Sequence, residues 1–238
     1  MRTKIMSLLA VAFSLGVVQA ASAADMPAKA PIVKAPLAVP YNWTGFYVGI
    51  NGGGGWGRSS QTDTAGTTSG TYNQSGGLVG GTVGYNWQMT NWVLGLEADL
   101  DWANINGTVS NPNCTVVIGG APTCFTNLES FGTFRGRVGY AWERWLVYAT
   151  GGLAYGSIYT GQDSCGSAGP GSIATCGRKW QSGWTLGGGV EAFLAPRWSA
   201  KLEYLYADFG SPTMYTVFIP VSATEKVSIV RGGLNYHF

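Results

Sequence analysis

The chain ends on the stretch Glu225–Phe238, which reads EKVSIVRGGLNYHF and alternates between two kinds of side chain. In an extended conformation, one face is small or apolar and becomes aromatic toward its end: Ser228, Val230, Gly232, Leu234, Tyr236 and Phe238. The other face carries a cation, an amide and an imidazole, from Arg231, Asn235 and His237. Alternation with period two predicts a β-strand whose two faces meet different surroundings.

An aromatic residue at the very end of this strand is unusual, because a free terminus is normally frayed and polar. A chain that ends mid-strand on Phe238 is typical of the last strand of a bacterial outer-membrane barrel. Such a strand pairs with the first one, so that no edge stays unpaired in lipid. We expect Tyr236 and Phe238 to act as the signal that the outer-membrane assembly machinery reads.

Working back from this strand, the body of the chain repeats a unit of strand, long polar link, strand and short turn. Strands are expected near residues 44–56, 77–88, 92–105, 131–142, 145–158, 182–194, 198–208 and 226–238. The links alternate strictly in length: 89–91, 143–144 and 195–197 are short, and 57–76, 106–130, 159–181 and 209–225 are long. This layout predicts an all-β fold, an eight-stranded antiparallel up-and-down transmembrane β-barrel with short periplasmic turns and four long extracellular loops.

Tryptophans gather at both ends of the expected strands, as amphipathic rings do at the two membrane interfaces. The belt beside the short turns should contain Trp43, Trp87, Trp92, Trp142, Trp145 and Trp198. The belt beside the long links should contain Trp56, Trp102, Trp180 and Trp184. Trp92 and Trp102 share one face, and their separation at ~3.3 Å per residue and ~40° tilt spans about 25 Å, the height of the apolar band. A soluble β-sandwich gives no reason for belts at both strand ends.

Charged side chains alternate with these apolar faces and therefore point into the barrel. The expected lumen set is Glu97, Asp99, Asp101, Arg135, Arg137, Glu191, Lys201, Glu203 and Arg231. A charge that faced lipid at the midplane would cost about 2–4 kcal/mol, and inside the barrel it must pair to offset its desolvation. Eight strands leave room only for side chains. An ionic plug is therefore favoured, and a charged ion pathway is the open alternative.

The start of the chain predicts export. A basic beginning, Arg2 and Lys4, is followed by a mostly apolar run, and residues 21–23 (Ala-Ser-Ala) fit signal-peptide cleavage before Ala24. A transmembrane anchor is the alternative, but a helix needs ~20 apolar residues to span a bilayer. The expected organisation is a signal peptide at 1–23, a Pro/Ala-rich periplasmic linker at 24–40 and an outer-membrane β-barrel at 41–238.

Composition narrows the class of function. Charged residues make up 11% of the chain, against roughly 25% in a typical soluble domain. Glycine occurs 37 times, beside 10 tryptophans, 12 tyrosines and 9 phenylalanines, which suits a surface facing lipid. The net charge is +2, falls to zero once Arg2 and Lys4 are removed, and shows no basic block that would bind nucleic acid. No cofactor is expected.

The four cysteines fall in expected long links, Cys114 and Cys124 in one and Cys165 and Cys176 in another. Four cysteines allow three connectivities, and pairing within each loop is the simplest in an oxidising compartment. With no paired CxxC spacing and one histidine, His237, no metal site is expected. An enzyme would need an activated nucleophile or an acid–base set, and the sequence around His237 shows no such partners.

Six short motifs, taken together, resemble the alphaproteobacterial immunogenic outer-membrane proteins. They are NWTGFYVG (42–49), VGYNWQ (83–88), GLEAD (95–99), RGRVGY (135–140), KLEY (201–204) and GGLNYHF (232–238). The resemblance covers about residues 41–238 and implies an eight-stranded barrel related to opacity-type adhesins and to the transmembrane part of outer membrane protein A. Members are often labelled porins, and some are credited with haemin binding or host contact through their loops.

These observations favour an integral outer-membrane barrel with a structural and surface role, at most weak pore activity and no enzymatic activity. Its expected partners are outer-membrane lipids and the assembly machinery. A loop-mediated adhesin, a receptor for a ligand such as haemin and a small porin stay open as alternatives.

Overall fold

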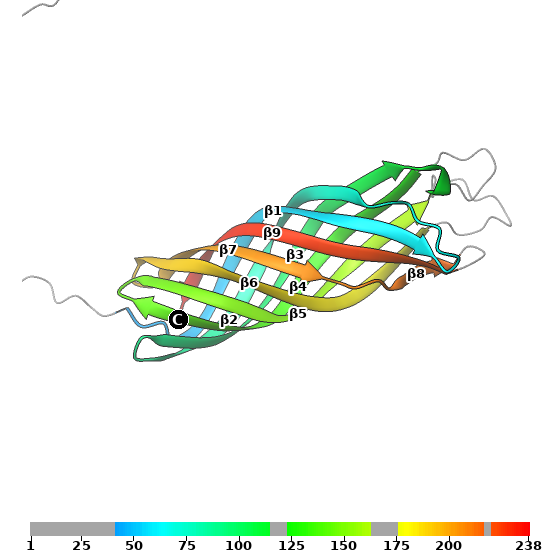
Figure 1. Ribbon diagram of the computed structural model, residues 1–238. Coiled ribbons are helices and arrows are strands. Elements are labelled where there is room, and N and C mark those ends of the chain that lie inside the picture. The colour runs from blue at the N-terminus through cyan, green and yellow to red at the C-terminus, as the bar shows by residue number, and fades with distance from the viewer. Residues whose placement is uncertain (1–40, 115–122, 163–175, 217–219) are drawn as a thin grey trace, which may run out of the picture. The chain divides into compact units, whose positions relative to one another are not determined.

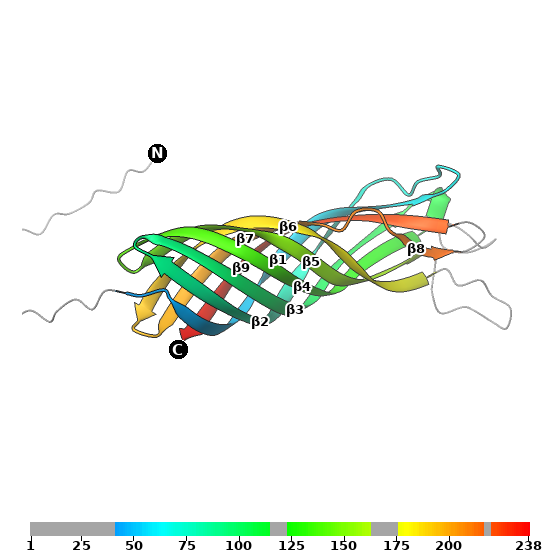
Figure 2. The same cartoon turned by 90° about the horizontal axis from the view of Figure 1, so that it is seen from below.

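The computed structural model describes residues 41–114, 123–162, 176–216 and 220–238. The predicted signal peptide, its cleavage before Ala24 and the linker at 24–40 lie outside these residues, and so does Cys165. Strands make up most of what is described, and they wind around a common axis (Figures 1 and 2).

Nine strands and one short 3-10 turn form in the described part of the chain. They are β1 (Gly45–Asp63), β2 (Tyr72–Met89), β3 (Trp92–Ser110), η1 (Pro112–Cys114), β4 (Thr123–Trp142), β5 (Trp145–Gln162), β6 (Cys176–Ala195), β7 (Trp198–Asp208), β8 (Thr213–Thr216) and β9 (Pro220–His237). β9 returns to β1, with partners from Tyr47 and His237 at one end to Asp63 and Val221 at the other. β8 pairs only with β9, beyond the end of β7. The remaining eight strands close the predicted antiparallel up-and-down barrel, so the fold prediction is confirmed.

Tight turns at 90–91, 143–144 and 196–197 join the strands at one end of the barrel. Thr90 and Glu143 have φ angles of 56° and 51°, a left-handed conformation that few non-glycine residues adopt. Two-residue hairpins use it because the twist of such turns matches that of the strands. The carboxyl terminus lies at this same end (Figure 1). We call it the periplasmic end, and the opposite end the extracellular end.

The strands run further toward the extracellular end than the sequence pattern predicts. β1 continues beyond residue 56 to Asp63, and β4 already begins at Thr123 rather than near 131. Much of the stretches expected as loops, 57–76, 106–130 and 159–181, is therefore strand. Above the membrane the outer face meets water, so polar and apolar side chains no longer alternate there, although the backbone pairing continues. Those expected boundaries are wrong for that reason.

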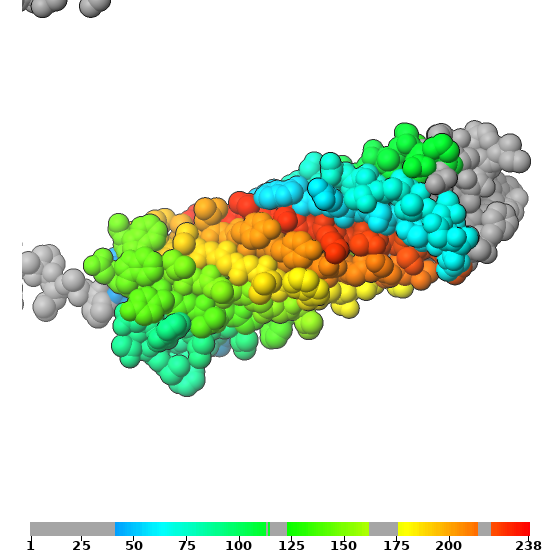
Figure 3. All heavy atoms as spheres, in the orientation of Figure 1, coloured from blue at the N-terminus to red at the C-terminus, as the bar shows by residue number. Residues whose placement is uncertain are grey.

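Side chains alternate between the lumen and the outer surface along each strand. On β9 the inward residues Arg231, Asn235 and His237 are buried, whereas Leu234 and Phe238 on the other face are 43% and 73% exposed. Figure 3 shows the outer surface of β9, β7 and β6, where side chains pack next to one another along the wall. The apolar face of the terminal strand is thus the face that lipid covers.

The interior is built in layers. At the periplasmic end a lower apolar cluster contains Trp43, Val93, Ala141, Leu146, Tyr148 and Phe193. Toward the extracellular end an upper apolar layer contains Leu78, Ile105, Leu128, Phe131, Ala154, Ile158, Leu205, Ala207, Phe209, Val221, Ala223, Val227 and Ile229. The sequence did not predict this upper layer. Part of the reason is a bulge at Leu128–Ser130 in β4, which reverses the inward and outward parity of that strand.

Candidate functional site

Between the two apolar regions lies a layer of charged side chains, all of which point inward and are at most 4% exposed. It contains Glu97, Asp99 and Asp101 of β3, Arg135 and Arg137 of β4, Glu191 of β6, Lys201 and Glu203 of β7, and Arg231 of β9. We call these nine residues the charged layer. Strand register places opposite charges directly across from each other in three pairs: Glu97 with Arg135, Glu191 with Lys201, and Glu203 with Arg231.

Arg135 contacts three carboxylates at once. Its Nη2 binds Glu97 and lies 2.9 Å from Asp99 Oδ2, and its Nη1 lies 3.0 Å from Glu203 Oε1. The remaining Nε donates to Thr133 Oγ1 at 2.8 Å, and Thr133 in turn donates to Asp99 Oδ2 at 2.8 Å. The guanidinium is thus bonded on every side, as a buried cation requires.

Arg231 reaches the same group of acids from the other side of the lumen. Its Nη2 lies 2.7 Å from Asp99 Oδ2, its Nη1 2.8 Å from Asp101 Oδ2, and its Nε 2.9 Å from Glu203 Oε2. Arg135 and Arg231 therefore share Asp99 and Glu203, and β3, β4, β7 and β9 are joined across the barrel.

Glu97 connects this group to the side chains nearer the periplasmic end. Its Oε2 accepts hydrogen bonds from Lys201 Nζ at 3.0 Å and Tyr47 Oη at 2.7 Å, and it lies 3.6 Å from Arg137 Nη1. Arg137 sits between two aromatic rings, 5.1 Å from the centre of Tyr47 and 4.9 Å from that of Tyr148. Such cation–π contacts stabilise a desolvated guanidinium. Tyr47 and Tyr148 were not predicted as part of the site.

Glu191 anchors the periplasmic edge of the layer. It lies 3.1 Å from Arg137 Nη1 and accepts from Ser199 Oγ at 2.5 Å and Asn235 Nδ2 at 2.7 Å. Ser199 Oγ is also 2.9 Å from His237 Nε2. A hydroxyl, an imidazole and a carboxylate therefore do meet here. In a serine triad the histidine stands between the other two and takes the hydroxyl proton, whereas here the fully buried Ser199 donates its hydrogen bond directly to Glu191.

The arrangement is suited to holding the wall together and to excluding solutes. Five carboxylates face four cations, so most of the charge is cancelled within the layer. Within the described ranges, no cluster of three or more histidine, cysteine or acidic side chains could hold a metal ion. The acidic and basic side chains of the charged layer thus pair with one another.

Further polar contacts lie at the extracellular end of the upper apolar layer and were missed because their stretches were expected as loops. Gln61 Nε2 donates to Thr160 Oγ1 at 2.8 Å, and Tyr72 Oη lies 2.6 Å from Thr126 Oγ1. These bonds link β1, β2, β4 and β5 across the lumen near its extracellular end. No sequence signal marks them, since serine, threonine and glutamine are common in loops as well.

The tryptophan belts are placed on the outer surface with one exception. The outward-facing rings, between 40% and 78% exposed, are Trp56, Trp87, Trp92, Trp102, Trp142, Trp145, Trp180, Trp184 and Trp198. Trp92 packs edge-on against Tyr140 at 5.7 Å, and Trp198 against Tyr236 at 5.3 Å. Rings of this kind lie at the level where apolar lipid meets water.

The interface-belt prediction is wrong for Trp43, whose side chain is fully buried. It precedes β1, so the alternation of a strand does not determine its direction. Its ring turns into the lumen and packs against Phe193, with centroids 4.4 Å apart, and against His237 at 5.8 Å. A large apolar ring that can close the periplasmic mouth gains more there than at the interface.

The carboxyl terminus is held in the sheet to its last residue. The amide of Phe238 donates to the carbonyl of Phe46 at 3.1 Å, and Arg197 donates to the Tyr236 hydroxyl at 3.0 Å. The Tyr236 and Phe238 rings stack edge to face at 5.3 Å. Both aromatic residues of the predicted assembly signal are therefore fixed beside the first strand.

Cys114 and Cys124 form a disulfide between η1 and β4, with Cα atoms 5.3 Å apart. Cys176, at the start of β6, is disulfide-bonded as well. Its predicted partner, Cys165, lies outside the described residues, so the pairing of Cys165 with Cys176 stays a prediction.

Comparison with known proteins identifies a family, two relatives and a solved structure of similar fold. The family described as "Outer membrane protein beta-barrel domain" matches residues 9–238. The 31 kDa outer-membrane immunogenic protein of Brucella melitensis biotype 1 is 36% identical over 252 residues, which cover 100% of both chains. The 22 kDa outer membrane protein of Rhizobium leguminosarum bv. viciae is 33% identical over 178 residues, 75% of this chain and 70% of the relative. The crystal structure of the outer membrane protein OprG from Pseudomonas aeruginosa matches with a TM-score of 0.51 at 14% identity, over 83% of this chain and 99% of that one, a likeness of fold.

Proposed function

Since the chain belongs to the outer membrane protein β-barrel domain family, among the immunogenic outer-membrane proteins of alphaproteobacteria, we propose that it is a structural and surface protein of the outer membrane whose lumen is sealed. Its role is to occupy and present surface, not to pass solutes, and its conductance is weak at most. The observation that carries this proposal is the stacking of the charged layer beneath the upper apolar layer.

Two layers in series are a stronger seal than either one alone. An ion that crossed the charged layer would have to separate pairs whose atoms lie 2.7–3.1 Å apart. It would then enter a region lined by side chains such as Phe131 and Phe209, whose rings pack edge to face. A bare ion pays a large desolvation penalty in such surroundings. Opening one layer therefore leaves the other in place.

Planar-bilayer recording of the refolded protein tests the seal. Wild type should give no stable open channel. We expect the same of a variant that opens only the apolar layer, Phe131→Ala with Phe209→Ala, and of one that removes only a charge pair, Glu203→Ala with Arg231→Ala. The combination of all four substitutions should conduct. A large, stable channel in wild type would overturn the proposal and favour a small porin.

Assembly through the terminal aromatic residue is part of the same proposal. Phe238 is 73% exposed and adds no side chain to the lumen, so its removal should leave the folded barrel stable. Deletion of Phe238 should nonetheless lower the amount of protein that reaches the outer membrane and raise the periplasmic amount. Unchanged outer-membrane levels would count against a signal role. Phe46→Ala, on the outer face of β1, is a matched control for the loss of an exposed ring.

A receptor or adhesin is the second candidate, supported by the extension of the wall beyond the outer tryptophans. The β1–β2 hairpin continues to Asp63 and Tyr72, well past Trp56. This extension lifts the connections away from the membrane surface, and the relatives that carry "immunogenic" in their names fit exposed connections. Replacing residues 64–71 by a two-residue turn should abolish binding of a host-surface or haemin ligand if that connection carries it, with the barrel intact.

A further inference from the structure

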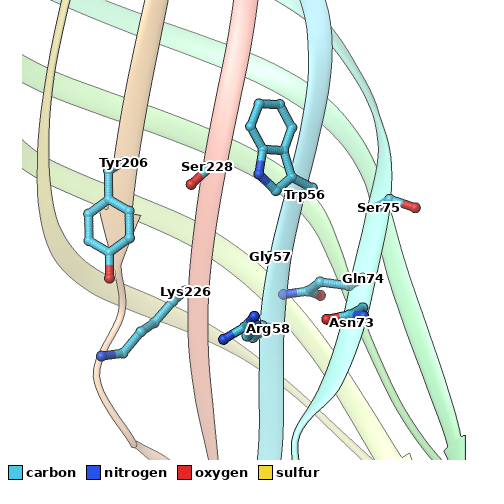
Figure 4. A pocket seen from close by; sticks show the side chains of 9 residues that line it. All are labelled: Trp56, Gly57, Arg58, Asn73, Gln74, Ser75, Tyr206, Lys226 and Ser228. Carbon is cyan, nitrogen blue, oxygen red and sulfur yellow. The ribbon is translucent and has the colours of Figure 1, made fainter.

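A hollow of about 660 Å³ opens on the outer wall, next to the extracellular belt. Four neighbouring strands, β7, β9, β1 and β2, form it. One row of register partners across these strands consists of Tyr206, Ser228, Trp56 and Ser75. Figure 4 shows the two rings on either side of Ser228. The small side chain of Ser228 between the rings of Tyr206 and Trp56 leaves the space.

The next row toward the extracellular end holds two cations side by side. Arg58 and Lys226 are direct register partners on β1 and β9, and both side chains are exposed. Like charges placed opposite each other on one face repel. Lys226 pairs with Asp208 on its far side at 3.2 Å, whereas Arg58 has no ion pair within the described part of the chain. Within the described residues, the positive charge of Arg58 is therefore not balanced by an acidic partner.

On the membrane side of the hollow, the outer surface carries glycines and small apolar side chains. Gly54 and Gly52 of β1 follow Trp56 toward the membrane, with Val230 and Val79 on the strands at either side. A Cβ atom added at Gly52 or Gly54 would meet its nearest heavy atoms at 3.5 Å and 3.7 Å, which is ordinary contact, so the outer face of this glycine lane is not covered by other side chains. The row of Trp56 and Ser228 separates this lane from the two cations, and on β9 only the small side chain of Ser228 stands between Val230 and Lys226.

We propose that this hollow binds a phosphate-bearing lipid of the outer leaflet. The phosphate lies between Arg58 and Lys226, and one acyl chain runs down the glycine lane beside Trp56. An arginine fork matches phosphate oxygens in pairs, and tryptophan is favoured at the level where headgroups meet acyl chains. A soluble anion would use the cations alone, while a lipid uses the cations, the rings and the lane together. The site is on the outer wall, so it holds whether or not the lumen conducts.

Native mass spectrometry of the refolded full chain in detergent tests this with diphosphoryl lipid A as the probe. Arg58→Gln with Lys226→Gln should weaken binding roughly 25-fold, about fivefold for each cation near a membrane surface. The matched control is Arg178→Gln with Lys179→Gln, which removes the same charge beside Trp180 on β6 and should leave affinity within about twofold. Ser228→Phe keeps both cations but fills the hollow, and it should also weaken binding.

Four results would overturn the proposal. Equal losses of lipid A affinity in the Arg58/Lys226 variant and in the control would indicate that the probe is attracted by positive charge anywhere around the extracellular end of the barrel. Full competition by inorganic phosphate, or unchanged affinity in Ser228→Phe, would indicate an anion site without a lipid. A dimer of the chain that is lost in the Arg58/Lys226 variant would indicate that a second copy covers the hollow. Each variant is first run on a gel with and without heating, to check that it shows the heat-modifiable electrophoretic mobility of a folded barrel.

Discussion

On β7, Lys201 and Glu203 point into the charged layer, and Leu205 and Ala207 on the same strand point into the upper apolar layer. The two layers are neighbours and are equally buried, but they differ in what holds them. Each ion in the charged layer depends on named partners at set distances, such as Glu203 Oε1 and Arg135 Nη1 at 3.0 Å. The apolar side chains need only neighbours of suitable size.

This contrast shows how the interior of a narrow barrel is specified. Lipid requires an apolar outer face, so any charge on a spanning strand has to point inward, where it must find partners. The charged layer therefore links strands that stand opposite each other, because its ion pairs join residues from five strands. The apolar layer contributes a stabilising free energy of roughly 25 cal/mol for each Å² of apolar surface removed from water. This contribution does not require particular partners or contact geometries.

The largest effect expected is from Arg135→Ala, which leaves Glu97, Asp99 and Glu203 short of a partner. We expect a loss of about 3–5 kcal/mol in the free energy of unfolding, the usual result of breaking a buried ion network on one side. Urea unfolding of the refolded protein in lipid vesicles, followed by tryptophan fluorescence, measures it. The control is Arg178→Ala, whose exposed pair with Glu129 at 2.8 Å should contribute less than about 1 kcal/mol.

Acidification should distinguish the two layers. As the pH falls, the carboxylates that lose one of their cations in Arg135→Ala take up protons, so the difference in stability from wild type should shrink. A packing defect has no charge to neutralise and should not respond. Equal losses in Arg135→Ala and Arg178→Ala would contradict the view that the charged layer fixes the barrel.

A smaller effect is expected from Leu205→Ala in the upper apolar layer. Leu205 is fully buried, and the cavity left by such a substitution costs about 2–3 kcal/mol at the lower end of the range for leucine. Leu202→Ala on the same strand, where the side chain is 57% exposed to the lipid side, is the control. It should change stability by less than half as much. The same urea midpoint measures both, and a larger loss in Leu202→Ala would contradict the existence of a packed upper layer.

The smallest effect is expected from Cys114→Ser with Cys124→Ser. The disulfide closes a sequence separation of 10 residues above the membrane, and it acts mainly on the unfolded chain. Resistance to heat in detergent reports the rate at which the folded barrel unfolds. The temperature at which the folded band disappears on a gel should therefore stay within a few degrees of the wild-type value. A large fall would show that this end of the wall takes part in the barrier to unfolding. Arg58→Ser, at an exposed position on the outer surface of β1, serves as the control.

Several features could be predicted because each strand separates two environments sharply. Glu97, Asp99 and Asp101 alternate with leucines and a tryptophan, so their inward direction followed from the sequence, and the register then placed Glu97 opposite Arg135. The eight-stranded barrel and its closure by the last strand were likewise predictable from the alternation of short and long links. These features depend only on local periodicity and on the exclusion of charge from lipid.

Other features could not be predicted from the local pattern of the sequence. Leu128 points inward only because the bulge in β4 shifts the parity of that strand. Trp43 lies ahead of the first strand, so its burial depends on the space left by Phe193 and His237 at the periplasmic mouth. Strand length beyond the outer belt was also missed, since water on the outer face removes the contrast on which the pattern depends.

The class of fold, the inward direction of nine charges and the outward direction of nine tryptophans follow from the order of the residues, because each residue of a strand faces either lipid or lumen. Which acid meets which base, where the apolar side chains close the lumen, and the pairing of Arg58 with Lys226 follow from the assembled barrel. Those outcomes depend on strand register and on bulges, which bring together residues far apart in the chain and leave no periodic trace in it.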